Sequence, residues 1–244
     1  MVPSSSADDV AASLGQVHPL LLAALPGLVD AVAPPAVLSH DRARLDPDEV
    51  LASQRWRLLL ATAQTMAAEG YAAATIERIT TEAGVSKKTF YKFFASKEEA
   101  FLACYDAIEP ALDFVLERAQ GPDTATGMVE AVVSNYLTTL AAAPALTRLF
   151  LIEALTATPT IRARRSATIA QLADAVGELI EEQRAEAARA HVLDRAQLVA
   201  MLGGVNELCV EHLVANEPET LPTLTPAIVQ FVLRVLGVAP EGRD

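Results

Sequence analysis

Residues 75–94, TIERITTEAGVSKKTFYKFF, are the key to the fold of this chain, because their pattern predicts two short helices joined by a tight turn. Thr75 is a suitable N-cap for the first helix, since its hydroxyl can accept a bond from a free amide. Gly84 can adopt the left-handed backbone conformation that ends this helix. Ser86 can cap the second helix as Thr75 caps the first. Two helices with so short a connection cross steeply, as in a helix-turn-helix.

The predicted second helix, residues 87–94, has an apolar face and a basic face. Phe90, Phe93 and Phe94 follow the spacing i, i+3, i+4 and form one apolar ridge. The other positions carry lysines and hydroxyls, which bind the phosphates and base edges of DNA. The alternative is a solvated helix of an all-helical bundle whose lysines are merely exposed. We expect the DNA contacts to come from Thr75, Ser86, Lys87, Lys88, Thr89, Tyr91, Lys92 and Lys97.

The role expected for Lys97 depends on the helix that follows this motif. Ser96 is a suitable N-cap for that helix, so Lys97 stands at its first turn. Free amides at a helix N-terminus bind anions. We therefore expect Lys97 and these amides to hold a DNA phosphate together.

Taken alone, the net charge of the whole chain, −12, argues against DNA binding, but the charge is unevenly distributed along the sequence. Residues 50–97 carry seven basic and three acidic side chains, a charge of +4, so the remainder carries −16. A basic head on an acidic body orients a protein on a duplex and keeps the body away from the phosphates. The charge distribution is therefore consistent with a DNA-binding head.

From about residue 55 to residue 101 the chain resembles the N-terminal domain of the tetracycline-repressor (TetR) family of transcriptional regulators. Two positions depart from the family pattern, Thr80 for the usual alanine and Phe90 for the usual leucine. The resemblance covers about a fifth of the chain. It rests on Glu69-Gly70-Tyr71, Thr75-Ile76, Ile79-Thr80, Ala83-Gly84-Val85-Ser86, Phe90-Tyr91, Phe94 and Ser96-Lys97-Glu98.

The composition predicts an all-α protein. Hydrophobic residues make up 52% of the chain but aromatic residues only 5%, which favours closely packed helices over a β-sandwich. No stretch of useful length alternates apolar and polar residues. After the helix-turn-helix, glycine, proline and polar breaks separate the expected helices. We expect helices over residues 47–69, 97–120, 124–142, 145–156, 160–189, 194–216 and 225–236.

Three parts follow along the chain. Residues 1–46 form an N-terminal extension, residues 47–97 the three-helix DNA-binding domain and residues 98–240 a helical domain for effector binding and dimerisation. Arg42 and Arg44 stand just ahead of the first helix, which Asp46 or Asp48 can cap. Two interpretations of these arginines stay open: an arm that reaches into the minor groove, or an ordinary solvated linker.

Several classes of function lack a pattern in this sequence. Cys104 and Cys209 stand 105 residues apart in apolar segments, which is typical of reduced core cysteines. The four histidines have no metal-ligand spacing, and no nucleophile or nucleotide-binding motif is present. We expect no catalytic residue, cofactor or metal. Without a secretory signal or a run of about 20 apolar residues, we expect a cytoplasmic protein.

The last two expected helices are the candidates for dimerisation. In proteins that this chain resembles, these helices pair across a two-fold axis into a four-helix bundle. Glycines inside a helix suit the close approach of another helix, and an apolar stripe follows in the last helix. The alternative is that both helices only fill the core of the monomer. The candidate contacts are Gly203, Gly204, Phe231 and Val235.

The resemblance also implies a ligand cavity among the middle helices. That region is mostly alanine, leucine and valine, so an apolar or amphipathic small molecule suits it. Each polar or aromatic candidate could equally be an ordinary core or surface residue. The candidates for the pocket are Tyr105, Asn135, Tyr136, Phe150, Glu153 and His212.

These expectations together predict a ligand-responsive transcriptional repressor. It would bind palindromic operator DNA as a homodimer, because one short recognition helix reads few bases, and a small-molecule effector would release it. Two alternatives belong to other classes. One is an all-helical carrier or enzyme that happens to bear a basic helix pair. The other is a DNA-binding protein without a ligand.

Overall fold

A computed structural model describes residues 47–117, 124–183 and 193–238 of the chain. Throughout these residues the structure is helical, without a β-strand, which confirms the predicted all-α class. The N-terminal extension, with Arg42, Arg44 and Asp46, lies outside the described residues, as do residues 184–189 of one expected helix and residues 118–120 of another.

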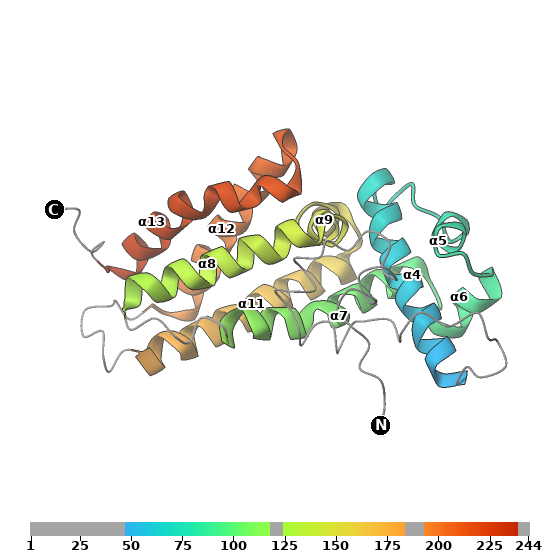
Figure 1. Cartoon of the computed structure of the whole chain (residues 1–244), viewed down its shortest axis with the longest axis horizontal. Coiled ribbons are helices and arrows are strands. Elements are labelled where there is room, and N and C mark those ends of the chain that lie inside the picture. The colour runs from blue at the N-terminus through green and yellow to red at the C-terminus, as the bar shows by residue number, and fades with distance from the viewer. Residues whose placement is uncertain (1–46, 118–123, 184–192, 239–244) are drawn as a thin grey trace, which may run out of the picture.

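Four helices form the head and the link to the body. They are α4 (Pro47–Glu69), α5 (Ile76–Glu82), α6 (Lys87–Phe93) and α7 (Lys97–Glu117). Figure 1 shows α4, α5 and α6 gathered at one end of an elongated molecule, with α7 running from this head along the body. Helix α7 contacts α4 in the head and α8 and α11 in the body, so it is shared by both parts.

In the described residues the body consists of four longer helices and four short helical segments. The long ones are α8 (Ala125–Ala142), α11 (Pro159–Gln183), α12 (Arg195–Ala215) and α13 (Thr225–Leu236). The short ones between α8 and α11 are α9 (Pro144–Arg148), the π-helical η2 (Leu149–Glu153) and α10 (Ala154–Thr156), and the 3₁₀-helical η3 (Pro218–Leu224) precedes α13. Helix α13 has the predicted bounds, and α8 and α12 differ from theirs only by the capping residues.

The helix expected over residues 145–156 is replaced by three segments. After α8 the chain turns by 105° at Ala143–Pro144 and then passes through five π-helical residues. Leu149 and Phe150 belong to the core of the head, whereas Leu151 belongs to the core of the body. A regular α-helix repeats every 3.6 residues, and the wider π turn changes that phase within one segment. The segment therefore serves two cores that lie on different sides of it.

Helix α4 buries the side predicted from its sequence. Leu58, Leu59, Thr62, Ala63 and Met66 are all 3% exposed or less. On the opposing helix, Phe90 and Phe94 are buried with their ring centroids 5.6 Å apart, and Phe93 packs at the edge of the same cluster. Burial of a large apolar side chain contributes about 1.5–3 kcal/mol, so these side chains account for the cohesion of the small head.

The predicted caps of the helix-turn-helix are present. The Thr75 hydroxyl accepts a bond from the Arg78 amide at 3.3 Å, and the Ser86 hydroxyl accepts one from the Thr89 amide at 3.1 Å. Gly84 has a φ of +61°. The Arg57 guanidinium donates to the carbonyls of Ala83 and, at 2.9 Å, of Gly84, which ties α4 to the turn. The turn is therefore held by its own caps and by the neighbouring helix.

By length and composition, helix α12 is long and apolar enough to cross a membrane. Helix α8 and the segment Pro144–Thr156, which is bent from it by 105°, would also be long and apolar enough if the two counted as one span. Such a result is weak evidence, because the core helix of a soluble protein passes the same test. Six residues of α12 are buried against other parts of the chain. This packing accounts for part of the apolar character of α12, because 33% of its most apolar stretch is buried.

Gly84→Ala should destabilise the head. A non-glycine residue in the left-handed region costs about 1–2 kcal/mol, and the added Cβ would lie 2.6 Å from the Arg57 Nη2 atom. Urea denaturation should therefore show a loss of at least this size. The same change in an Arg57→Ala background should retain the backbone cost without the clash, so the two effects should not add. Wild-type stability of Gly84→Ala would contradict the structure of this turn.

Candidate nucleic-acid interface and effector pocket

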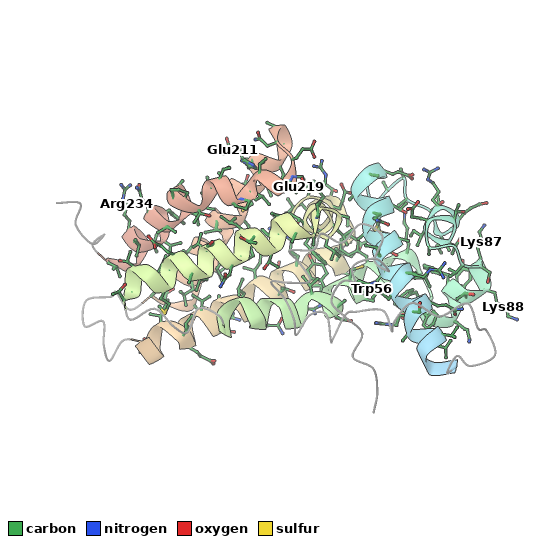
Figure 2. All side chains as sticks on the ribbon, in the orientation of Figure 1. Trp56, Lys87, Lys88, Glu211, Glu219 and Arg234 are labelled. Atoms are coloured by element: carbon green, nitrogen blue, oxygen red, sulfur yellow. The ribbon has the colours of Figure 1, made fainter. Side chains whose placement is uncertain are left out.

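The outer face of α6 carries the basic side chains expected to contact DNA. Lys87, Lys88, Tyr91 and Lys92 are exposed, and the tyrosine keeps 57% of its surface accessible. Figure 2 shows Lys87 and Lys88 projecting from the end of the molecule that lies farthest from the body. The buried face of the same helix holds Phe90 in the core. Helix α6 is thus anchored on one side and open on the other.

The hydroxyls near α6 are engaged in capping. Ser86 and Thr89 form a side-chain pair at 3.0 Å in addition to the cap bond. Lys87 forms an exposed ion pair with Glu77 of α5 at 3.1 Å. Exposed ion pairs contribute little free energy, so Lys87 can exchange this partner for a phosphate. The predicted DNA-contact residues of the turn and α6 follow one another over positions 86–92, and Thr75 stands at the N-terminus of the neighbouring α5.

Lys97 is placed differently from the prediction. Its ammonium donates to the carbonyls of Tyr71 at 2.7 Å, Ala74 at 2.8 Å and Ala72 at 3.3 Å, and it lies 4.6 Å from the Tyr71 ring centroid. An ammonium has three protons, and these carbonyls take them. The geometry gives Lys97 a structural role in the turn between α4 and α5, and its contact with a phosphate stays a prediction.

A cavity of about 90 Å³ lies in the body between α8, α11, α12 and α13. At about 10–15 Å³ for each water-sized group, it has room for roughly six to nine such groups. Its wall is apolar except for one partly buried pair, in which the Tyr136 hydroxyl donates to the Asn206 Oδ1 atom at 2.7 Å. The lining residues are Met128, Val129, Val132, Val133, Tyr136, Leu172, Val176, Leu179, Ile180, Met201, Leu202, Val205, Asn206, Val232 and Leu236.

Of the six pocket candidates, Tyr136 alone lines this cavity. Tyr105 and Phe150 pack against each other in the core of the head, with ring centroids 4.5 Å apart. His212 bonds to the Thr220 hydroxyl at 2.7 Å, and Asn135 lies partly exposed on α8. These residues were chosen as the rare polar and aromatic side chains of the region, a criterion that ignores which face of a helix they occupy.

Glu153, the sixth candidate, joins the head to the body. Its Oε2 atom accepts a bond from the Tyr71 amide at 2.8 Å and lies 3.5 Å from the position of a Cβ on Gly70. Glu153 is the last residue of the π-helical segment η2. It therefore connects this segment to the turn that Lys97 holds from the other side.

Asn206 and Arg57 were not predicted as functional residues. Asn206 is 9% exposed on a helix that is otherwise apolar on nearly all sides. A lone amide in such a helix requires a buried polar partner, and this signal was available from the sequence. For Arg57 no local signal existed, because its acceptors lie 26 and 27 residues away.

The dimerisation candidates differ in whether other parts of the same chain already pack against them. A Cβ on Gly203 would meet nothing within 4 Å, whereas one on Gly204 would lie 3.4 Å from the Phe231 ring of the same chain. Phe231 and Val235 are partly buried against the body core. On the same two helices Glu211 and Arg234 point outward (Figure 2), while Leu208 and Val214 remain 37% and 80% exposed. The face around Gly203 is open in this single chain.

Burial governs the titration of the polar groups in the body. It raises the pKa of the Tyr105 phenol to about 12 and raises the pKa of Tyr136 further above its ordinary value. Burial also raises the pKa of both Cys104 and Cys209 to about 12, so these free thiols stay protonated at neutral pH. A protonated thiol is a poor nucleophile. In the described ranges, no three histidine, cysteine or acidic side chains gather as a metal site.

A family model described as "Bacterial regulatory proteins, tetR family" matches residues 58–104, from the middle of α4 into α7. No curated protein matches the chain. Among solved structures, the fatty acid degradation regulator FadR from Bacillus halodurans is 18% identical with a TM-score of 0.65, over 81% of this chain and 100% of that one.

FadR from Bacillus subtilis, solved in complex with stearoyl-CoA, is 18% identical with a TM-score of 0.62, over 75% of this chain and 98% of that one. A transcriptional regulator from Aquifex aeolicus is 19% identical with a TM-score of 0.57, over 75% and 99%. At this identity the likeness shows the shared fold, and the matched head carries the family pattern. Residues 58–104 therefore carry the pattern of the TetR family of bacterial regulatory proteins, and the chain as a whole shares the fold of these solved regulators.

Proposed function

We propose that this regulator is a cytoplasmic repressor that binds palindromic operator DNA as a homodimer and is released by a small apolar or amphipathic effector. One observation carries the proposal: a single chain joins an exposed basic helix, α6, to a body with an almost wholly apolar cavity. A DNA-binding surface and a small-molecule pocket in one protein are the two sites that effector-dependent regulation requires.

Helix α6 has the features of a recognition helix. Its exposed lysines can neutralise phosphates, and Tyr91 can reach a phosphate or a base edge. It is only seven residues long, so one copy reads few base pairs. Two copies related by a two-fold axis would read two half-sites about one helical turn apart. The contacts proposed are Thr75, Ser86, Lys87, Lys88, Thr89, Tyr91 and Lys92.

A second copy of the chain is proposed to cover the outer face of α12 and α13. The open space beside Gly203 and the exposed Leu208 and Val214 support this choice. Glu207 and Glu211 on α12 and Arg234 on α13 are exposed on these same helices and can pair between copies. The effector cavity between α8, α11, α12 and α13 would then lie next to the dimer interface.

The effector is proposed to be a molecule with an apolar chain. The lining of the cavity supports this, because Tyr136 and Asn206 are its main polar residues and they satisfy each other. The Bacillus subtilis FadR, which shares the fold, was solved with stearoyl-CoA. An apolar cavity with few polar groups selects for shape and hydrophobicity.

The coupling between cavity and head is proposed to run through η2. Leu151 belongs to the core that surrounds the cavity, Phe150 to the core of the head, and Glu153 holds the Tyr71 amide. A ligand that favours a different position of η2 would shift the turn before α5. Such a shift requires only that the effector bind the two conformations with different affinities. Effector and operator then weaken each other reciprocally.

A footprint on the DNA upstream of the protein's own gene, with and without an apolar ligand, tests the proposal as a whole. A protected palindrome that opens on adding ligand is the expected result. Turnover of a small molecule without any footprint would favour an enzyme or carrier. A footprint that no ligand changes would favour a ligand-independent DNA-binding protein.

Lys88→Ala and Lys92→Ala should weaken operator binding nearly equally for all sequences. Removing one phosphate-binding charge should make the slope of log K against log salt shallower by about 0.9, as measured by fluorescence anisotropy over a salt series. Arg195→Ala on the body, where Arg195 pairs with Asp174, is the matched control and should change nothing. Lys97→Met should reduce thermal stability and leave the slope unchanged. A shallower slope for Lys97→Met would mean that Lys97 binds a phosphate after all.

Gly203→Ala should weaken the dimer and leave the monomer fold intact. If a helix of the second copy approaches this glycine, overpacking should cost about 1–3 kcal/mol, measured as a raised dissociation constant by analytical ultracentrifugation. If the helices only fill the monomer core, alanine should instead stabilise the helix by about 0.5–1 kcal/mol without changing the oligomeric state. That second result would contradict the proposed interface.

Val176→Phe should fill the effector cavity. Val176 lines it from α11, so the larger ring should reduce the affinity for octan-1-ol at least tenfold, an effect of about 1.4 kcal/mol, as measured by calorimetry. Operator affinity without ligand should stay within about twofold of wild type, because the change lies far from α6. Unaltered octan-1-ol binding would mean that the ligand occupies another site.

A further inference from the structure

Arg165 on α11 is a partly buried cation without an acidic partner among the residues that the structure describes. The two arginines beside it are engaged: Arg164 pairs with Asp106 at 3.2 Å, and Arg162 donates to the Ala157 carbonyl at 2.6 Å. Removing a charge from water is costly unless a counter-charge or hydrogen bonds compensate for it. An unpaired guanidinium in this position is therefore a candidate anion-binding group.

The position of Arg165 on α11 aligns it with the cavity. Leu172 and Val176 line the cavity, and they follow Arg165 by seven and eleven residues. At 3.6 residues per turn these positions share one face of the helix. Arg165 then stands roughly 10 Å from Leu172 along the helix axis, at the end of α11 nearer the head (Figure 1). The apolar stripe that walls the cavity thus ends in a cation.

A second polar group without a partner lies close to Arg165. The Tyr105 side chain is 2% exposed, and its hydroxyl has no hydrogen-bond partner within the described parts of the chain. The Arg164 Cζ atom is 5.5 Å from the Tyr105 ring centroid. Helices α7 and α11, which carry Tyr105 and Arg165, contact each other. The positive charge of Arg165 opposes the rise that burial causes in the pKa of both Tyr105 and Tyr136. Tyr136 lines the cavity, and this connects the surroundings of Arg165 and Tyr105 with the cavity.

We propose that Arg165 and the Tyr105 hydroxyl form a subsite for an oxyanion at the head-facing end of the apolar cavity. The effector is then an unbranched apolar chain that ends in a carboxylate or a phosphate. The guanidinium offers parallel donors that match either oxyanion, and the phenol donates one further bond. The subsite rests on the proposed function of the cavity as the effector site and specifies which class of molecule enters it.

The test compares octanoate, octyl phosphate and octan-1-ol on the full chain by isothermal titration calorimetry. Wild type should bind at least one of the two anions at least tenfold more tightly than the alcohol. Arg165→Gln should bring the anions to within about threefold of the alcohol and leave the affinity for the alcohol unchanged. Tyr105→Phe should weaken anion binding about tenfold. Arg162→Gln, on the exposed side of the same helix, is the matched control and should preserve the preference for anions.

Thermal unfolding of the free protein separates a binding role from a structural one. Arg165→Gln should unfold at the wild-type temperature or above it, since it removes a cation that has no described acidic partner. A marked loss of stability together with loss of alcohol binding would overturn the subsite, because Arg165 would then be part of the framework.

Comparison of the two anions shows whether the charged end of the effector is a carboxylate or a phosphate. Preference for octanoate identifies a carboxylate, and preference for octyl phosphate identifies a phosphate. Equal binding of anions and alcohol by wild type would overturn the subsite and leave the cavity as an effector site. Failure of all three probes to bind would overturn both the subsite and the effector site, while the operator footprint would still report on DNA binding alone.

Discussion

The turn between α4 and α5 is held by two charged side chains, and the position of the head on the body depends on it. The Lys97 ammonium binds three carbonyls of residues 71–74, and the Glu153 carboxylate accepts a bond from the Tyr71 amide. Bonds to charged groups are about twice as strong as neutral ones. Lys97 belongs to α7 and Glu153 to η2, so the turn is fixed from both sides. Both segments therefore contact the turn that precedes the DNA-binding motif, which is the basis of the coupling proposed above.

The π-helical segment η2 links the turn between α4 and α5 to the core of the body. Its residues contribute to the core of the head and to the core of the body, and neither core can be repacked without moving it. Close-packed interiors respond to such displacement by switching between packings and do not deform continuously. The short chain of contacts from the cavity through η2 to Tyr71 is therefore the physical route proposed for effector control.

The helices and caps of the head could be predicted because their determinants are local, whereas the contacts of Arg57 and Lys97 could not. Thr75, Ser86 and Gly84 act within four residues of their own positions, and the buried face of α4 follows from helical spacing. The same reasoning predicted α8, α12 and α13. It did not predict the division of residues 145–156 into three segments, because that break depends on packing against two separate cores.

The amino-acid sequence was sufficient for the all-α class, the helix-turn-helix and the family pattern of the head, since these depend on patterns that repeat over a few residues. The roles of Lys97, Glu153 and the cavity residues depend on tertiary packing. Glu153 and Tyr71 are 82 positions apart and Asn206 and Tyr136 are 70 apart. Such pairs form only when distant helices pack, and no local spacing encodes which of many polar side chains will face one another. The DNA-binding motif can therefore be predicted from the sequence, whereas the apolar cavity between the body helices required the packed helices.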